Sequence, residues 1–180
     1  MQQSSSEASR RLVVMRHSKA EPTAPSDHGR ALAARGRGDA AEAGRWLREQ
    51  GIIPDVALVS DALRTQQTWE QIAAGAGWDF SPDFTPDFSA ALYAAGADSA
   101  FDLIREVDAA ATTLLVIGHN PTMAYIAELI DDGEGDPDAT TDLVTRGFPT
   151  SALAVFAVAD EWVDLGPGAG RLEAFHVGDG

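Results

Sequence analysis

The 180 residues of this chain include no cysteine. A disulfide, a zinc site with thiolate ligands and a cysteine nucleophile are therefore all excluded. Nitrogen-centred chemistry has to come from the four histidines. The apolar share of 44% is that of an ordinary globular protein and names no activity by itself.

Long hydrophobic runs are missing as well. No apolar run approaches the length needed to span a membrane. The start of the chain, residues 1–11, is rich in serine and glutamine and lacks the apolar core of a secretory signal. We therefore expect a flexible tail over residues 1–10, one domain over residues 11–180, a cytoplasmic location and no membrane partner.

Positive charge is scarce in this sequence. Thirteen lysines and arginines stand against 28 aspartates and glutamates, which gives a net charge of −15. Nucleic acid is excluded as a partner, because polyanion binding needs a basic surface that releases counterions. A phosphorylated substrate is also repelled at long range, so it has to be held by a local cluster of arginines and histidines. The places where the arginines fall are therefore informative.

Short strands and helices alternate along the chain. Apolar or β-branched runs predict strands at residues 11–15, 55–59, 112–117, 152–158 and 171–176. Helical spacing of apolar residues is found at residues 40–47, 61–74, 98–107 and 121–130. Ser60 and Asp61 are expected to cap the second of these helices. The alternation predicts an α/β fold, a three-layer α/β/α sandwich with a mainly parallel central sheet.

One acidic segment interrupts this alternation. Residues 131–141 combine acidic residues with glycine and proline, which predicts a mobile surface loop. Apart from the alternation itself the sequence has no internal repeat. A chain of this length suits a single domain that buries roughly 70% of the surface exposed by its unfolded form.

Polar groups follow three of the expected strands. Arg16 and His17 follow the first strand, residues 60–64 follow the second, and residues 118–120 follow the strand at 112–117. In open α/β sheets ligands bind at the carboxyl ends of strands, close to helix N-termini that favour anions. We therefore expect the three groups to meet at one edge of the sheet.

Two histidines and two arginines at one edge suit a phosphoryl group. Guanidinium groups bind its oxygens in pairs, and an imidazole can attack phosphorus. No cluster of carboxylates for a divalent metal accompanies them, so we expect neither a metal nor a cofactor. Each residue alone is more simply interpreted as a solvated strand-end residue, but their joint placement favours a site.

Five segments resemble one known family. Residues 12–20 (LVVMRHSKA) resemble the "RHG/RHA" signature of the histidine phosphatase superfamily. Residues 27–36 resemble its "D-x-x-R-P-L-x-x-x-G" stretch, and residues 59–68 resemble its "V-S-S-x-x-R-A/T-x-Q-T". Residues 116–121 are similar to its "V-G-H-N-P", and residues 150–152 resemble a late segment. The order is that of the family, and the small SixA-like branch with its phosphoglycerate mutase-like fold is the most similar.

The resemblance implies a role for four residues. His17 would be the nucleophile, neutral at its attacking nitrogen, and would form a phosphohistidine that water then hydrolyses without a metal. Arg16 and Arg64 would grip the phosphoryl oxygens. His119 would add a hydrogen bond to the transferred group and stabilise charge in the transition state.

Four further residues leave alternatives open. Asp87 best resembles the family carboxylate that protonates the leaving group, but it also suits an exposed loop aspartate. Ser18 could touch phosphate or cap its loop. Asn120 could orient His119 at the substrate or only cap the following helix. Lys19 adds positive potential at the mouth of the site or is simply solvated.

The leading hypothesis is a phosphatase. Its substrate would be phosphohistidine in a protein or a small phosphorylated molecule. A phosphomutase of the same superfamily and a non-catalytic module that binds phosphorylated ligands are the alternatives. A dinucleotide-binding oxidoreductase loses its main support, because no G-x-G-x-x-G follows the first strand.

Overall fold

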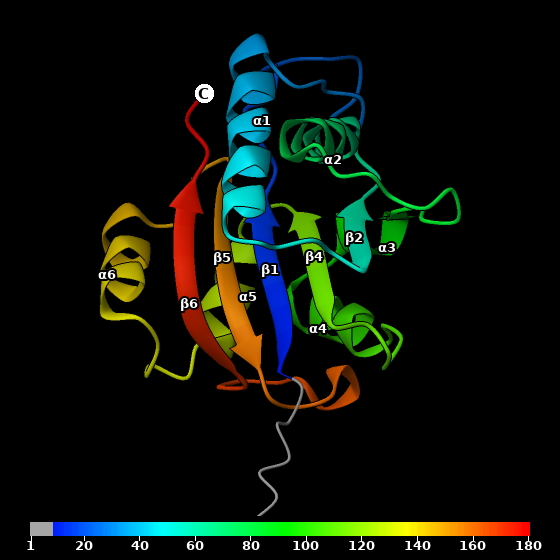
Figure 1. Cartoon of the computed structure of the whole chain (residues 1–180). Coiled ribbons are helices and arrows are strands. Elements are labelled where there is room, and N and C mark those ends of the chain that lie inside the picture. The colour runs from blue at the N-terminus through cyan, green and yellow to red at the C-terminus, as the bar shows by residue number, and fades with distance from the viewer. Residues whose placement is uncertain (1–8) are drawn as a thin grey trace, which may run out of the picture.

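The computed structural model describes residues 9–180 and shows a six-stranded sheet between two layers of helices (Figure 1). The strands are β1 (Arg10–Arg16), β2 (Val56–Ser60), β3 (Asp87–Ser89), β4 (Thr113–Gly118), β5 (Ala152–Val158) and β6 (Gly170–Val177). Their order is β3-β2-β4-β1-β5-β6. The pairs β3–β2, β2–β4 and β4–β1 are parallel, whereas β5 is antiparallel to both of its neighbours. The predicted α/β fold with a mainly parallel sheet is confirmed.

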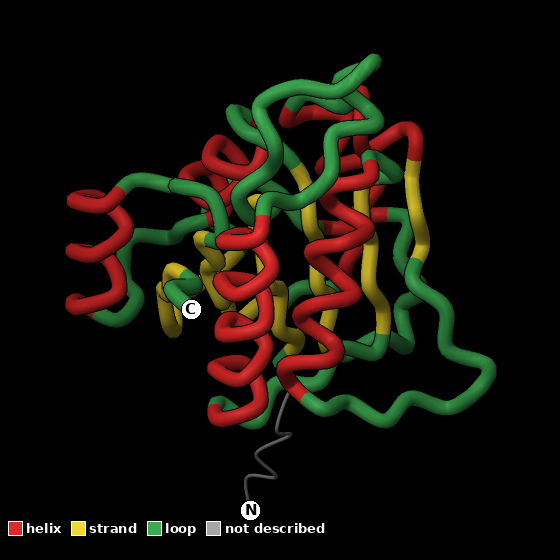
Figure 2. The backbone as a smooth tube through the Cα atoms, turned by 90° about the horizontal axis from the view of Figure 1, so that it is seen from above, coloured by secondary structure: helices red, strands yellow, loops and turns green. Residues whose placement is uncertain are grey.

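Helices cover both faces of this sheet. They are α1 (Ala34–Glu49), α2 (Leu63–Ala76), α3 (Ala90–Ala94), α4 (Ala97–Arg105), α5 (Thr122–Ile130), α6 (Pro137–Arg146) and the short 3₁₀ helix η1 (Trp162–Asp164). One core lies between the sheet and α1 with α2, and the other lies between the sheet and α4 with α5. Figure 2 shows α6 standing apart from the two long helices, on the β6 side of the molecule.

The apolar run of β1 follows from its central place. Leu12 and Val14 face the core under α4 and α5, whereas Val13 and Met15 face the core under α1 and α2. All four side chains are fully buried. A strand that is buried on both faces has no polar face to show, which explains why its sequence does not alternate.

The predicted loop at residues 131–141 is in part wrong. Helix α6 begins inside it, at Pro137. The Asp136 carboxylate accepts a hydrogen bond from the Ala139 backbone N–H at 2.9 Å, and proline follows in the first helical turn. Aspartate before proline is a helix start signal. The acidic composition of the segment masked this signal, and the short elements β3 and α3 were not predicted at all.

The start of the chain is described only in part. The predicted flexible tail, residues 1–10, lies outside the described residues except for Ser9 and Arg10, and Arg10 is the first residue of β1. Across residues 9–180 no helix has both the length and the apolar character needed to cross a membrane. The cytoplasmic location stays a prediction.

Two glycines let α1 and α2 approach closely. A Cβ atom at Gly44 would lie 2.2 Å from the Ile72 carbonyl oxygen, and one at Gly75 would lie 2.1 Å from the Ala41 carbonyl oxygen. Neither distance is compatible with a side chain. The layer that covers β1 and β2 therefore depends on both positions being glycine.

Replacing Gly44 with alanine should destabilise the protein by about 1 to 3 kcal/mol, because the helices have to move apart. Helix propensity acts in the opposite direction, by about 1 kcal/mol. Gly38→Ala in the same helix is the matched control, since its Cβ would meet only the carbonyl group of Gly180, the oxygen at 3.3 Å and the carbon at 3.5 Å. Urea unfolding measures both free energies, and a Gly44→Ala protein as stable as the wild type would contradict the packing argument.

Candidate active site

The predicted polar groups meet at one edge of the sheet. Arg16 pairs with Gly118 in the β1–β4 ladder, and Val59 pairs with Ile117 in the β2–β4 ladder. The carboxyl ends of β1, β2 and β4 are therefore level with one another. As a result the rings of His17 and His119 lie 5.3 Å apart, centroid to centroid.

His17 has one engaged and one available ring nitrogen. Its backbone N–H donates to the Gly118 carbonyl at 3.0 Å, which continues the ladder by one step. Its Nδ1 lies 2.7 Å from the Ser18 carbonyl oxygen, and because that oxygen can only accept, Nδ1 carries the proton. Nε2 then keeps its lone pair. The ring is buried but 8% of the residue remains exposed.

Burial keeps this imidazole neutral. Desolvation lowers the pKa of His17 to about 4, helped by the positive charges of Arg64 and Arg16, while the hydrogen bond to Ser18 acts in the opposite direction. At neutral pH the side chain is therefore uncharged. Neutrality together with a free Nε2 is what attack on phosphorus requires.

Arg64 is buried in the first turn of α2. Its Nη1 donates to the Asp27 carbonyl at 2.8 Å, and its Nη2 lies 3.1 Å from the Asp27 carboxylate and 3.2 Å from Nδ1 of His119. The guanidinium is thereby fixed beside both histidines. Only 5% of the residue is exposed.

Two arginine N–H groups at the site are buried and lack an acceptor. They are Nε of Arg16 and Nε of Arg64, neither of which finds a partner among residues 9–180. Arg16 is held otherwise by a 3.3 Å hydrogen bond from Nη1 to the Phe148 carbonyl. Buried donors are nearly always satisfied, so these two point to an anionic oxygen from a ligand.

Both ring nitrogens of His119 are engaged by the protein. Nδ1 accepts from Arg64, so Nε2 carries the proton and donates to the Ser60 hydroxyl at 2.7 Å. Burial, followed by the charge of Arg64, lowers the pKa of His119 to about 3. A hydrogen bond from His119 to a phosphoryl oxygen thus requires that Nε2 exchange Ser60 for the ligand. The Ser60 hydroxyl also accepts from the Ala62 N–H at 3.3 Å, and the expected capping of α2 by Ser60 and Asp61 is wrong, because the N-cap is Ala62.

Ser18 is buried next to His17 and is held by hydrogen bonds within the protein. The residue is fully buried, its backbone N–H donates to the Thr68 hydroxyl, and its own hydroxyl accepts from Ser151 at 2.6 Å. Ser151 has a positive φ of 64°, and its N–H donates to the His17 carbonyl at 3.1 Å. These contacts argue against the expected touch on phosphate and favour a role in holding His17.

The side chain of Asn120 caps the start of helix α5, which is one of its two predicted roles. Its side-chain oxygen accepts from the Ala124 N–H in the first turn of α5, at 3.2 Å, and its amide donates to the Phe148 carbonyl at 2.7 Å. It therefore shares this carbonyl with Arg16. Asn120 positions the segment that holds Arg16, and it makes no hydrogen bond to the ring of His119 among those of the described chain.

A carboxylate that the sequence did not single out lies at the site. Asp27 accepts from Tyr93 at 2.7 Å, from Arg30 at 3.1 Å and from Arg64 at 3.1 Å. The hydrogen bond from Tyr93, joined by those from the two arginines, holds the pKa of Asp27 well below its usual range. Asp27 and Arg30 fall in the second family-like segment, which was the available signal, but no strand end marks them.

Asp87 lies at a different place. It is exposed on β3 opposite Leu58, two residues before the end of the strand. Within residues 9–180 its side chain makes no hydrogen bond to the other site residues. The structure thus brings together His17, Arg16, Arg64 and His119, and places Asp87 on β3 without a hydrogen bond to them.

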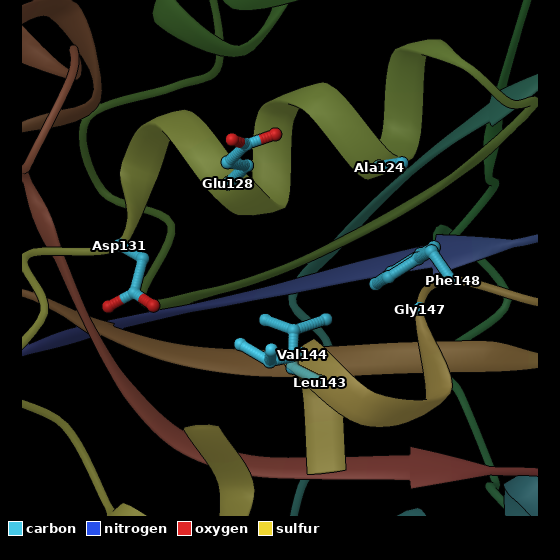
Figure 3. Close-up of a pocket in the computed structure, with 7 residues that line it drawn as sticks. All are labelled: Ala124, Glu128, Asp131, Leu143, Val144, Gly147 and Phe148. Atoms are coloured by element: carbon cyan, nitrogen blue, oxygen red, sulfur yellow. The ribbon is translucent and has the colours of Figure 1, made fainter. Parts of the chain in front are cut away.

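A separate cavity of about 300 Å³ lies between α5 and α6 (Figure 3). Leu143, Val144 and Phe148 give it apolar walls, and Glu128 and Asp131 stand at one end. No arginine or histidine lines it. Its chemistry does not suit an anion, so the candidate site for an anionic ligand is the one around His17. The described residues contain no group of three histidine, aspartate or glutamate side chains that could hold a metal ion.

Both site histidines should remain neutral well below pH 6. Because their folded pKa values are depressed and the unfolded value is 6.5, the unfolded chain takes up protons first as the pH falls. The contribution of these two histidines to the free energy of unfolding should therefore be fully present above pH 6.5 and be lost as the pH falls from there toward pH 4. Imidazole ¹⁵N NMR titration, assigned with His17→Gln and His119→Gln, and urea unfolding at each pH test this; midpoints near 6.5 for these two rings would contradict it.

Comparison with known proteins agrees with this geometry. A family model for the histidine phosphatase superfamily (branch 1) matches residues 12–89. An uncharacterized protein of Mycobacterium tuberculosis (strain ATCC 25618 / H37Rv) is 38% identical over 164 residues, which cover 91% of this chain and 99% of that protein.

Solved structures extend the match to the whole fold. The protein assigned as the phosphohistidine phosphatase SixA in Nakamurella multipartitia superposes with a TM-score of 0.78 at 31% identity, over 93% of this chain and 95% of the other. The protein histidine phosphatase SixA complexed with tungstate gives a TM-score of 0.69 at 26% identity, over 93% and 96% of the two chains. The fold is the phosphoglycerate mutase-like fold that the resemblance implied. The chain therefore belongs to the histidine phosphatase superfamily, in its SixA-like branch.

Proposed function

We propose that this protein is a metal-independent phosphatase that works through a phosphohistidine on His17. The observation that carries the proposal is a neutral His17 with a free Nε2, beside two arginines whose buried Nε–H groups lack a protein acceptor. An oxyanion would satisfy both donors at once. The SixA structure solved with tungstate contains such an oxyanion.

The reaction has two displacement steps. The Nε2 lone pair attacks phosphorus, the bond to the leaving group breaks, and the leaving group takes a proton. Water then attacks the phosphohistidine, the N–P bond breaks, and inorganic phosphate leaves while His17 becomes neutral again. Arg16 and Arg64 stabilise the charge that spreads over the phosphoryl oxygens, and each such donor is typically worth about 3 to 4 kcal/mol.

The substrate is phosphohistidine in a protein or a small phosphorylated molecule. A phosphorylated protein partner would present a neutral or basic face, since the net charge of this chain is −15. A phosphomutase needs a retained phosphoenzyme in a closed pocket, for which this short chain offers little material. A non-catalytic binding module would have no use for a free Nε2 on His17.

Wild-type protein should hydrolyse an aryl phosphate in EDTA, and His17→Ala should lose at least about a thousandfold in kcat/KM. Phosphate trapped on the wild type should be acid-labile and alkali-stable. His176→Ala is the matched control, because His176 pairs with Glu42 and stacks on Trp46 away from the site. It should keep full activity.

Other outcomes assign other functions. Inert wild type that still binds phosphate would favour the binding module. Full activity of His17→Ala would show that His17 is not the nucleophile. Efficient transfer back to a second position of the substrate, in place of release to water, would favour the phosphomutase.

We propose Asp87 as the donor of the proton that the leaving group takes, because its place in the sequence resembles that of the family carboxylate and because the Asp27 carboxylate is already bound by Tyr93, Arg30 and Arg64. Asp87→Asn should then slow phenyl phosphate at least about tenfold more than 4-nitrophenyl phosphate, whose leaving group needs no acid. Asp83→Asn, an exposed aspartate of the preceding loop, is the control. Equal rates for both substrates with Asp87→Asn, or a selective loss with Asp27→Asn, would remove Asp87 from the mechanism.

A further inference from the structure

A second cavity opens beside the proposed nucleophile. It has a volume of about 350 Å³ and is lined by Lys19, by the start of α1, by the end of α6 with the turn that follows, and by the end of β6. Four segments that are distant in sequence thus form its wall. Its volume is within the range of small-molecule sites.

The cavity lies on the same edge of the sheet as His17. Strand β6 is antiparallel to β5, which is antiparallel to β1, so β6 ends where β1 ends (Figure 1). Lys19 is two residues from His17, which places their Cα atoms no more than about 7 Å apart. Thr150, another lining residue, precedes the Ser151 that binds the His17 carbonyl. The cavity therefore lies beside the backbone that carries His17.

Charged side chains of both signs line this cavity, with cations in excess by one. Lys19, Arg35 and Arg146 line it together with Asp39 and Asp179. Arg35 approaches both carboxylates, at 3.7 and 3.9 Å. Lys19 and Arg146 have no acidic partner within 4.0 Å among residues 9–180. Their charges are available to a ligand.

This concentration of charge stands out in so acidic a chain. Lys19 is the only lysine of the sequence. The positive charges of Arg16, Arg30 and Arg64 act on His17, so six of the thirteen basic residues gather at this edge of a protein with a net charge of −15. These cations favour an anion locally, against the long-range repulsion by the acidic chain.

The backbone segments that form the wall of the cavity pack closely against one another. The Lys19 carbonyl accepts from the Ala33 N–H at 2.9 Å, and a Cβ at Gly36 would lie 2.0 Å from that same carbonyl oxygen. A Cβ at Gly178 would lie 2.3 Å from the Asp39 carbonyl oxygen. Glycine at these two positions lets the backbones pack directly, and this packing fixes the backbone that carries Lys19.

We propose that this cavity binds a second anionic group, a carboxylate or a phosphate, on a small substrate whose transferred phosphoryl group lies at His17. The proposal rests on the proposed function and specifies its substrate class. Lys19 and Arg146 would contact the second group, and Arg35 would support them. A small molecule fits better than an acidic protein segment, because the cavity is small and an acidic protein surface would be repelled by the rest of the chain.

Binding of two phosphonates to the full chain tests the proposal without turnover. Phenylphosphonate presents one anionic group, and 3-carboxyphenylphosphonate presents two. Isothermal titration calorimetry should give a Kd for the second that is at least about tenfold lower. The double variant Lys19→Gln/Arg146→Gln should lose this preference while binding phenylphosphonate as the wild type does.

A charge-matched control separates local from general electrostatics. Arg37→Gln/Arg45→Gln removes the same charge from exposed positions of α1 outside the cavity, and it should retain the preference. Loss of the preference in this control, equal affinity of the wild type for the two phosphonates, or a preference that survives Lys19→Gln/Arg146→Gln would each overturn the proposal.

The binding data distinguish a wrong proposed function from a wrong second site. If phenylphosphonate itself does not bind, the phosphoryl site and the proposed function are wrong, and the second site is wrong with them. If it binds and the carboxylate adds nothing, only the second site is wrong. A wild-type preference confined to phosphohistidine peptides with an acidic neighbour would overturn the assignment to small molecules.

Discussion

The register between β1 and β4 is the constraint on which the site depends. Arg16 lies opposite Gly118, and the next step of the ladder is the hydrogen bond from His17 to that glycine. Side chains alternate along a strand, so a slip of one residue would turn His17 into the opposite face of the sheet. The neighbouring ladder between β2 and β4 fixes Ser60 at His119 in the same way. Positions of the reactive groups are therefore set by backbone pairing before any side chain interacts.

Charge acts at two ranges in this molecule. At long range the excess of carboxylates repels anions, whereas at the sheet edge arginines surround two histidines that burial keeps uncharged. The arrangement suits the nucleophilic role proposed for His17, because a protonated His17 would have no lone pair to offer. The Asp27 carboxylate balances part of the positive charge within the site, since it bonds to Arg64 and Arg30.

The sequence predicted those features that follow from single strands and their ends. The apolar run before His17, the β-branched run before His119 and the helix start at Arg64 were each local signals, and parallel pairing brings such ends together. Asp27 and Tyr93 were not predicted, because Asp27 lies in a loop and Tyr93 in the short helix α3, and only the folded chain places them beside Arg64. The orientation of Ser18 was not predicted either, because it depends on Ser151, which is distant in the sequence.

Ser18 and His119 show where residue identity stops being informative. A hydroxyl after the nucleophile suits phosphate or the protein equally well, and Ser151, more than a hundred residues later, decides between them. The hydrogen bond between His119 and Ser60 is likewise a property of the two ladders together. Helix α6 is a different case, because Asp136 and Pro137 carry a local signal that the surrounding acidic residues obscured.

The central position of β1 also has a consequence during synthesis of the chain. Leu12 pairs on one side with Leu114 and on the other with Phe156, and the strand has no polar face. During synthesis this apolar segment emerges well before its partner strands β4 and β5. Until then it is an unpaired, aggregation-prone edge. The strand that leads into His17 is thus also one that the nascent chain has to keep protected until its partner strands have been made.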